Sequence, residues 1–354
     1  LGAGSSAPFG YPPTKPFLEE LKKHIPESPD SSKTSEHLLR PFLKVEGVED
    51  AEHLIQLLDF IKESKESRQK FDPARNFFDK VTLQVQEVGS MRYQDFESAV
   101  LELREQVRRE IFRTYRWKQE AAKNFALYSE FFSVFGGRVL DVFTTNYDQL
   151  IEKYCANVKN VYLYDHFESD PKQRVWKWNP SATKDAMKDR KLLLGEGQVL
   201  RFYKLHGSLD WRRSREGEIH KVNIEEAVSN REESYTENLV IYPGTKYEPT
   251  SEPFRTLYET FDEKMSTATL CVVVGFSFRD YTLNRVFSRF LDRKDTVLIS
   301  ISRSATQNLE TNLMRGPIAN LQEGGKIVPI DKPFEKSTLV DLEQYIGRTL
   351  KEML

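Results

Sequence analysis

Only two cysteines occur among the 354 residues, Cys155 and Cys271. They lie far apart in the sequence, and neither belongs to a Cys-x-x-Cys pair. The sequence therefore lacks both the disulfide framework of a small secreted domain and the ligand spacing of a structural zinc site. We expect no zinc, and we interpret both cysteines as small core residues.

The sequence also lacks an excess of charge and any long apolar run. The 52 lysines and arginines nearly balance the 54 aspartates and glutamates, which leaves a formal charge of −2. Without a basic excess, direct binding to nucleic acid or to an acidic membrane surface is not expected. No apolar stretch approaches the length of a membrane-spanning helix, and no secretory signal is visible. These absences favour a globular protein of the reducing cytoplasm.

Strand and helix patterns alternate along most of the chain. Short runs rich in β-branched and apolar residues predict strands at 139–143, 161–163, 199–205, 239–242, 269–274, 296–301 and 326–330. Apolar residues at helical spacing predict helices at 14–24, 93–115, 254–265, 281–291 and 339–354, and another from about Gln149. A polar loop is expected from about Glu168 to Gly197. The alternation predicts an α/β fold with a Rossmann-like, doubly wound, mostly parallel sheet.

A long, almost entirely helical stretch interrupts this alternation between residues 31 and 135. The strongest helix in this stretch is 93–115, which carries apolar residues along one face. Gly136 and Gly137 mark the end of the helical stretch. We expect residues 1–30 and 136–354 to form the α/β domain, with 31–135 as an inserted helical subdomain. The aromatic residues of the insertion are interpreted as core or as a subunit interface; they are Phe77, Phe78, Phe125, Phe131 and Phe132.

A glycine-rich turn opens the chain. The segment from Gly2 to Ala7 fits the pattern G-x-G-x-x-G/A, in which missing side chains let backbone amides approach a pyrophosphate. Such a turn needs a strand to hold it, so we expect an apolar strand ahead of Leu1. The match is weak alone, because a glycine turn occurs in many loops, and the prolines that follow delay the next helix to about Thr14.

Polar residues follow three further predicted strands, at Thr144–Asp148, at His206–Ser208 and at Gly275–Ser277. In open α/β sheets, ligands bind outside the carboxyl ends of the strands. Taken alone, the first of these segments could equally be a turn whose polar side chains cap the following helix. The four segments together predict one site at the edge of the sheet.

The order and chemistry of these four segments resemble the sirtuin family, which has a Gly-Ala-Gly-x-Ser loop, a Thr-Gln-Asn-Ile-Asp motif, a His-Gly pair and a Gly-Thr-Ser loop. The resemblance spans residues 1–301 outside the helical insertion. It implies that the ligand is NAD and that the bond attacked joins nicotinamide to ribose. The residues that it implies for holding the nucleotide are Gly2, Ala3, Gly4, Ser5, Thr145, Gly275 and Ser277.

Three residues carry the chemistry that the resemblance implies. Asn146 would orient the nicotinamide ribose and a water molecule, and Asp148 would accept a hydrogen bond from the carboxamide. His206 would contact the ribose hydroxyls or act as general base, a role that suits imidazole because its ordinary pKa lies near neutrality.

Differences between this sequence and the sirtuin motifs indicate which reaction to expect. Protein-deacylating sirtuins carry a zinc ribbon of two Cys-x-x-Cys pairs after the His-Gly pair, whereas residues 208–270 contain no cysteine. Pro13, Thr14 and Lys15 stand where sirtuins have Asp-Phe-Arg, and the strand that ends at Ser302 lacks an acidic residue for the adenine ribose. We expect water as the acceptor, so the sequence predicts an NAD glycohydrolase.

A zinc-free sirtuin-like domain with a large helical insertion resembles the NAD-depleting effectors of prokaryotic antiphage defence, which act by abortive infection. That resemblance implies control by homo-oligomerisation or by a partner such as a HerA-like or STAND-type ATPase or an Argonaute. The chain has no phosphate loop of the Gly-x-x-x-x-Gly-Lys-Ser/Thr type, so an ATPase would be a separate polypeptide. The alternatives are a zinc-independent deacylase or ADP-ribosyltransferase, and a catalytically silent sensor or scaffold that binds NAD or ADP-ribose.

Overall fold

The computed structural model describes residues 1–13, 16–19, 21, 54–55, 57–58, 93–136, 139–170, 175–181, 197–222, 235–241, 250–315 and 326–353. The chain divides into two compact units. The first comprises Leu1–Tyr11, Tyr115–Ile241 and Lys246–Leu354, and the second comprises Pro12–Thr114 and Tyr242–Thr245. The expected division into residues 31–135 and the rest stays a prediction.

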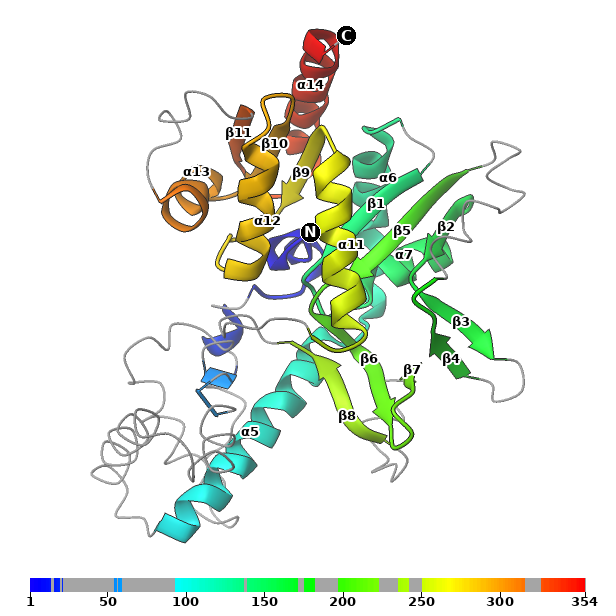
Figure 1. Ribbon diagram of the computed structural model, residues 1–354, viewed down its shortest axis with the longest axis vertical. Helices are drawn as coiled ribbons and strands as arrows, with labels where there is room; N and C mark the ends of the chain where they lie inside the picture. The colour runs from blue at the N-terminus through cyan, green and yellow to red at the C-terminus, as the bar shows by residue number, and fades with distance from the viewer. Residues whose placement is uncertain are drawn as a thin grey trace. The chain divides into compact units, whose positions relative to one another are not determined.

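Two three-stranded parallel sheets form the centre of the first unit (Figure 1). One has the order β1-β5-β2, with strands β1 (Val139–Thr144), β5 (Gln198–Lys204) and β2 (Val161–Tyr164). The other has the order β11-β10-β9, with strands β11 (Lys326–Asp331), β10 (Val297–Ser302) and β9 (Leu270–Val274). These strands and the helices between them confirm the α/β fold with parallel sheets.

Most helices of this unit agree with the predicted spacing, whereas the short α13 (Ala305–Asn308) was not predicted. The others are α6 (Phe125–Ser133), α7 (Leu150–Asn157), α11 (Phe254–Thr267), α12 (Tyr281–Leu291) and α14 (Lys336–Met353). Helix α12 has the bounds that the sequence predicts, because its buried residues recur every three or four positions and Asp280 caps its first turn by accepting from the Leu283 amide. Phe125, Phe131 and Phe132 are buried, as expected of core residues.

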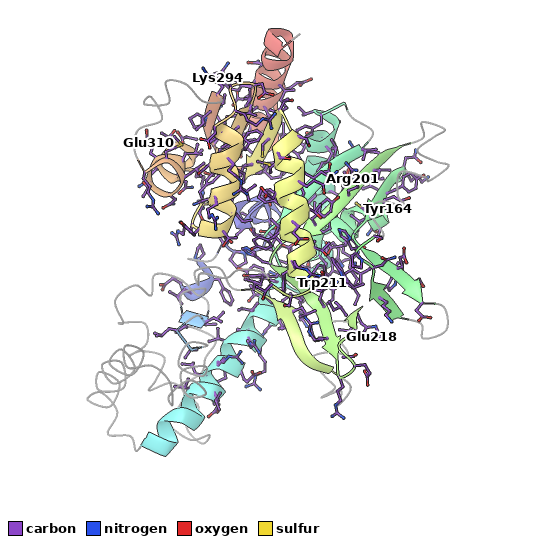
Figure 2. The ribbon with its side chains drawn as sticks, in the orientation of Figure 1. Tyr164, Arg201, Trp211, Glu218, Lys294 and Glu310 are labelled. Carbon is purple, nitrogen blue, oxygen red and sulfur yellow. The ribbon has the colours of Figure 1, made fainter. Side chains whose placement is uncertain are left out.

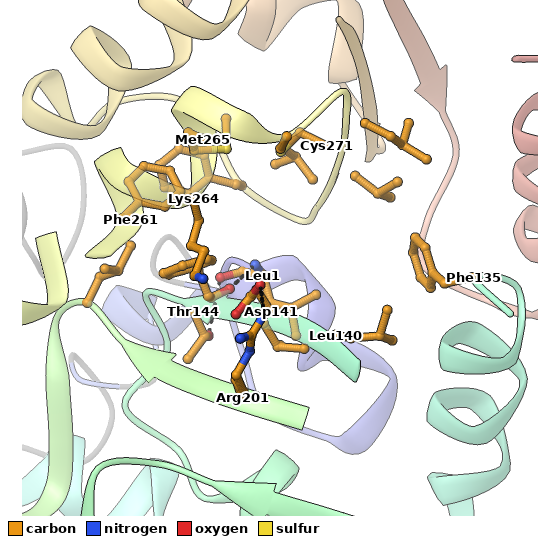
Figure 3. A pocket seen from close by; sticks show the side chains of 18 of the residues that line it. Leu1, Phe135, Leu140, Asp141, Thr144, Arg201, Phe261, Lys264, Met265 and Cys271 are labelled. Carbon is orange, nitrogen blue, oxygen red and sulfur yellow. Dashed lines mark hydrogen bonds and ion pairs between the residues drawn. The ribbon is translucent and has the colours of Figure 1, made fainter. Parts of the chain in front are cut away.

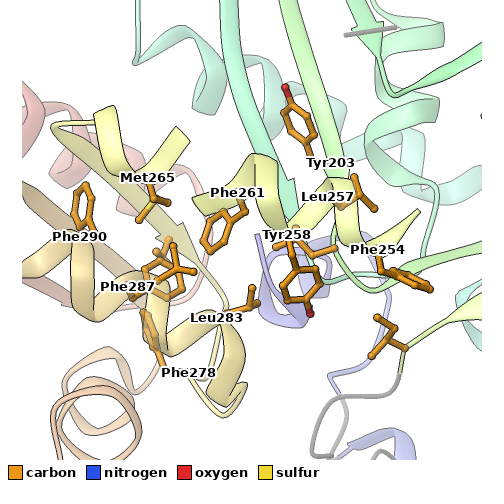
Figure 4. Packing of buried hydrophobic residues seen from close by; sticks show 14 of the residues in the cluster. Tyr203, Phe254, Leu257, Tyr258, Phe261, Met265, Phe278, Leu283, Phe287 and Phe290 are labelled. Atoms are coloured by element: carbon orange, nitrogen blue, oxygen red, sulfur yellow. The ribbon is translucent and has the colours of Figure 1, made fainter. Parts of the chain in front are cut away.

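Helices α11 and α12 pack against each other through apolar faces, together with residues from β5, β6 and β9 (Figure 4). Phe261 meets Phe287 at 5.6 Å between ring centres, and Phe278 meets Phe287 at 5.3 Å. Trp211, which is fully buried, belongs to the same cluster (Figure 2). This core anchors the segments that follow β5 and β9.

A five-stranded, antiparallel sheet is the main departure from the predicted elements. Its order is β3-β4-β7-β6-β8, with strands Phe167–Asp170, Val175–Trp178, Ile219–Lys221, Gly207–Ser214 and Tyr235–Val240, respectively. The prediction of a loop over 168–197 is therefore wrong where β3 and β4 lie, and the strand predicted at 239–242 ends at Val240. Strands of three or four residues are too short to show a clear alternating pattern, and their pairing depends on distant segments.

The second unit is described mainly through α5 (Tyr93–Tyr115), a helix with the predicted bounds. Val100, Leu103, Val107 and Ile111 are buried at three- and four-residue spacing along it. The rest of the predicted helical insertion between residues 31 and 92, apart from buried helical residues at 54–55 and 57–58, lies outside the described residues. Within the described parts of the chain, no helix combines the length and apolar character needed to cross a membrane.

A cavity of about 490 Å³ lies between β1 and β9 (Figure 3). At its end, the Leu1 nitrogen donates to the Phe143 carbonyl (2.6 Å) and the Gly2 amide donates to the Val274 carbonyl (2.8 Å). Leu1 and Gly2 thus connect the carboxyl ends of the two parallel sheets. The strand expected ahead of Leu1 stays a prediction.

Candidate functional site

The glycine–serine turn, Gly2–Ser6, packs against the Gly–Asp loop, Gly275–Asp280, without intervening side chains. The Gly4 amide donates to the Gly275 carbonyl at 3.0 Å. A Cβ on Gly275 would lie 2.3 Å from the Ser5 nitrogen, and a Cβ on Gly2 would lie 2.6 Å from the Gly275 oxygen. The glycines therefore permit a close approach of two backbone segments that are far apart in the sequence.

Most amides of this turn already have partners within the protein. Gly2 and Gly4 donate to the segment at Val274 and Gly275, while Ser5 donates to Gly2 and Ser6 donates to Ala3. The Ser5 hydroxyl donates to the Gly2 carbonyl at 2.8 Å. Phosphate binding by Gly2, Ala3, Gly4 and Ser5 stays a prediction, and it would require some of these bonds to be exchanged.

Two predicted catalytic residues lie on the Asn–Asp loop, Thr144–Asp148, and both contact the glycine–serine turn. The Asn146 amide donates to the Gly2 carbonyl at 3.1 Å and to the Ser6 hydroxyl at 2.9 Å. The Ser6 hydroxyl donates to Asp148 at 2.8 Å. The other Asp148 oxygen accepts at 3.0 Å from the amide of Leu150, the first residue of α7, although the N-cap of that helix is Gln149.

Burial raises the pKa of Asp148 above its usual value, although the charge of Lys204 and the hydrogen bonds from Leu150 and Ser6 oppose that shift. Burial also raises the pKa of Tyr128, whose hydroxyl interacts with Ser6 and is further influenced by the charge of Asp148. Tyr128 comes from α6, and the sequence gives no sign that its hydroxyl approaches these residues. The carboxyl of Asp148 therefore lies in a largely dry and polar cluster.

Lys204 holds the Asn–Asp loop in place through hydrogen bonds to its backbone. Its side chain is 2 % exposed, and its ammonium donates to the Asp148 carbonyl, to the Tyr147 carbonyl at 3.4 Å and to Glu152 Oε1 at 2.9 Å. A buried cation held by backbone carbonyls and one carboxylate resists movement of the loop. The end of β5 thus determines the position of Asn146 and Asp148.

His206 lies on the His–Gly turn, Leu205–Ser208, which joins β5 to β6. Its side chain is 1 % exposed, and Nε2 lies 2.9 Å from Asp280 Oδ2 of the Gly–Asp loop. The Leu205 amide donates to the Thr144 carbonyl at 2.8 Å, which holds the His–Gly turn against the Asn–Asp loop. Sequence reasoning missed Asp280 as a partner of His206, although its position just ahead of a predicted helix was visible.

The four predicted segments form a closed series of contacts. Asn146 binds the glycine–serine turn, the His–Gly turn binds the Asn–Asp loop, His206 binds Asp280, and Gly275 binds Gly4. Polar groups from four distant parts of the sequence therefore converge at the carboxyl ends of β1, β5 and β9. This is the edge of an α/β sheet at which ligands bind.

The remaining predicted residues, Thr145 and Ser277, lie at the edge of the group of contacts that the four segments form. The Thr145 amide donates to the Leu1 carbonyl at 3.0 Å, and Thr145 lines the cavity between β1 and β9. Ser277 accepts from Asn312 through its carbonyl at 2.8 Å. The lining of that cavity does not include Asn146, Asp148 or His206, so we do not assign it to the same site. No three-member group of His, Cys, Asp or Glu suited to a metal ion occurs among the described residues.

Residues 141–315 match the family model for a SIR2-like domain. The match begins in β1 and contains Asn146, Asp148, His206 and Asp280, and it supports a sirtuin-like domain in this part of the chain. SIR2-like domains use NAD and are typically NAD-dependent enzymes. A comparison with curated proteins found no match.

Proposed function

We propose that the protein is an NAD glycohydrolase that releases nicotinamide and ADP-ribose. In this reaction the C–N bond between ribose and nicotinamide breaks, and its electron pair goes to the nicotinamide nitrogen. Water supplies the oxygen of the new bond to the anomeric carbon and loses one proton. The observation that carries the proposal is the convergence of Asn146, Asp148 and His206 at the carboxyl ends of β1 and β5, within the segment that matches the SIR2-like domain.

Each of the three residues has a role that fits its surroundings. The bond breaks through a positively charged, oxocarbenium-like sugar, so a site of this kind must orient the ribose and exclude bulk water. The amide of Asn146 would orient the ribose and the attacking water, and Asp148 would accept a hydrogen bond from the carboxamide. The imidazole of His206 would take the proton that the water or a ribose hydroxyl releases.

Water is the acceptor that the chain favours. Residues 208–270, which include β6, β7 and β8, contain no cysteine and so cannot supply the four thiolates of the zinc ribbon that protein-deacylating sirtuins carry. Strands of the antiparallel sheet lie in this interval instead. Without the module that accompanies acyl-lysine binding in those enzymes, hydrolysis is the simplest outcome of breaking the nicotinamide bond.

We further propose a biological setting in which this activity depletes NAD during antiphage defence. An enzyme of this kind endangers its own cell, so control by homo-oligomerisation or by a separate ATPase or Argonaute is part of the proposal. The full-length protein should therefore be tested with its native genetic neighbours present.

The experiment measures NAD by chromatography in cells that carry the complete operon, before and after phage challenge. Wild-type cells should lose NAD and accumulate nicotinamide and ADP-ribose, whereas N146A and H206A should lower the rate of loss by about 10²-fold or more. N157A and H220A are matched controls, because Asn157 is exposed on α7 and His220 lies in β7, and both should retain the activity.

The same experiment, together with an assay in vitro, separates the alternatives. NAD loss that continues in N146A and H206A would contradict the catalytic assignment, and an unchanged NAD pool in challenged wild-type cells would favour a silent sensor or scaffold. Turnover that requires an acylated peptide in vitro would favour a deacylase.

A further inference from the structure

We infer that Asp280 is a positioning residue that fixes the proton of His206 on Nε2 and leaves Nδ1 as the basic nitrogen. The inference rests on the proposed function, because it names the ring atom that would take the proton during hydrolysis. Asp280 lies 74 positions after His206, in the connection between β9 and α12, whereas His206 lies between β5 and β6.

The two oxygens of Asp280 have separate tasks. Oδ1 accepts from the Leu283 amide at 3.0 Å and caps α12, while Oδ2 lies 2.9 Å from His206 Nε2. The Asp280 side chain is 11 % exposed and that of His206 is 1 % exposed, so little water competes for this hydrogen bond. Although burial of the carboxyl opposes the shift, the hydrogen bond to His206 lowers the pKa of Asp280 below its usual value. Asp280 is therefore an acceptor at neutral pH.

Both partners are held by rigid backbone. On the histidine side, the Ile241 amide donates to the His206 carbonyl at 2.9 Å, and Gly207 has a φ of 78° that places it tightly against Leu239. On the aspartate side, the buried Phe278 adopts a left-handed φ of 55° and its carbonyl accepts from Asn284 at 2.6 Å. A non-glycine residue holds that conformation only where its surroundings enforce it.

The environment of the imidazole selects one tautomer. A carboxylate facing Nε2 requires a donor there, so Nε2 carries a proton. Nδ1 is buried and has no hydrogen-bond partner among the described residues. A proton on Nδ1 would be left without an acceptor, which is costly in a buried site, so Nδ1 keeps its lone pair. It is the ring nitrogen that remains to accept a proton from water or from a ribose hydroxyl.

Two substitutions at position 280 test this inference without removing the cap. Asparagine and serine are both good N-cap residues, so D280N and D280S should retain the stability of α12. In D280N the amide oxygen caps Leu283, so the NH₂ group faces Nε2 and forces the proton to Nδ1. D280N should therefore lower kcat by about 10²- to 10⁴-fold with little change in KM, as expected when a histidine base is held in the wrong tautomer. D280S removes the partner without imposing the wrong tautomer, so it should lose less activity.

Nitrogen-15 NMR of the six-histidine protein provides a readout that does not depend on activity, with the His206 signals assigned by their loss in H206Q. Wild type should show a protonated Nε2 and a bare Nδ1, and D280N should show the reverse. A wild-type protein with its proton on Nδ1, or a D280N variant that keeps wild-type kcat, would overturn the inference. If wild type consumes no NAD while His206 shows the expected tautomer, the proposed function fails and the positioning role of Asp280 stands.

Discussion

Asp148 is a buried carboxyl group with two structural partners and one proposed ligand. Its oxygens accept from Ser6 and from the Leu150 amide, and Lys204 supplies the nearest positive charge. Because desolvation dominates, the pKa of Asp148 is raised in the folded protein. Ionisation of Asp148 therefore lowers the stability of the folded protein, and the remaining contacts must compensate for that loss.

The sign of this shift predicts how stability responds to pH. A carboxyl group whose pKa is raised on folding contributes stability below its unfolded pKa, and that contribution is lost as pH rises through its folded pKa. D148N keeps an acceptor oxygen for the Leu150 amide and cannot ionise, although it presents an NH₂ group where Asp148 accepts from Ser6. We expect the free energy of unfolding of D148N, relative to wild type, to increase as pH rises from the unfolded pKa of the carboxyl through its raised folded pKa, as measured by urea denaturation.

Asp280 serves as the reference for this experiment, because its pKa is lowered by His206 rather than raised. Its contribution to stability is present above the unfolded pKa and is lost as pH falls through the folded pKa. D280N relative to wild type should therefore show the opposite slope at acidic pH. A D148N difference that stays constant with pH would contradict the burial of an ionising carboxyl.

The sequence predicts where some candidate residues lie but not which residues they contact. Asn146 and His206 could be placed at the ends of strands because each follows a recognisable strand, and their catalytic roles stay predictions. Asp280, Tyr128 and Lys204 could not be assigned their contacts, because those contacts join segments that are distant in sequence and depend on tertiary packing. Their sequence contexts are those of an ordinary helix cap, a helix aromatic and a strand lysine.

The site requires the glycine–serine turn to pack closely against the Gly–Asp loop. Gly275 has a φ of 65°, and its missing side chain accommodates the backbone of Gly4 and Ser5. G275A should destabilise the protein by about 3 kcal/mol or more, because strain in the left-handed region adds to a backbone clash. The measurement is the urea midpoint together with NAD binding by calorimetry.

G217A is the matched control. Gly217 has a φ of 83° in the turn between β6 and β7, and nothing lies within 4 Å of the position that a Cβ would take. It should cost only about 1–2 kcal/mol from backbone strain. Equal losses in the two variants would show that the approach of the glycine–serine turn to Gly275 is unimportant.

Elements with long periodic patterns are the ones that sequence predicts well. The bounds of α5 and α12 agree with the prediction because their buried residues recur at helical spacing. Strands β3 and β4 could not be predicted, since four polar and aromatic residues such as Phe167–Asp170 carry no periodicity of their own. They join the sheet through the pairing of β4 with β7, which lies farther along the chain.

The whole molecule combines a sirtuin-like α/β unit with a unit described mainly through α5. The family match directs attention to NAD, and the proposal of hydrolysis over acyl transfer depends on the absence of cysteine from residues 208–270. Control by self-association or by a partner remains part of the proposal at this scale.

A crystal structure of H206A with NAD bound would locate the nucleotide, because that variant should bind NAD without consuming it. The nicotinamide ribose should contact Asn146, and its anomeric carbon should face the vacated position of the imidazole. NAD bound between β1 and β9, or with its ribose out of reach of Asn146, would contradict this expectation.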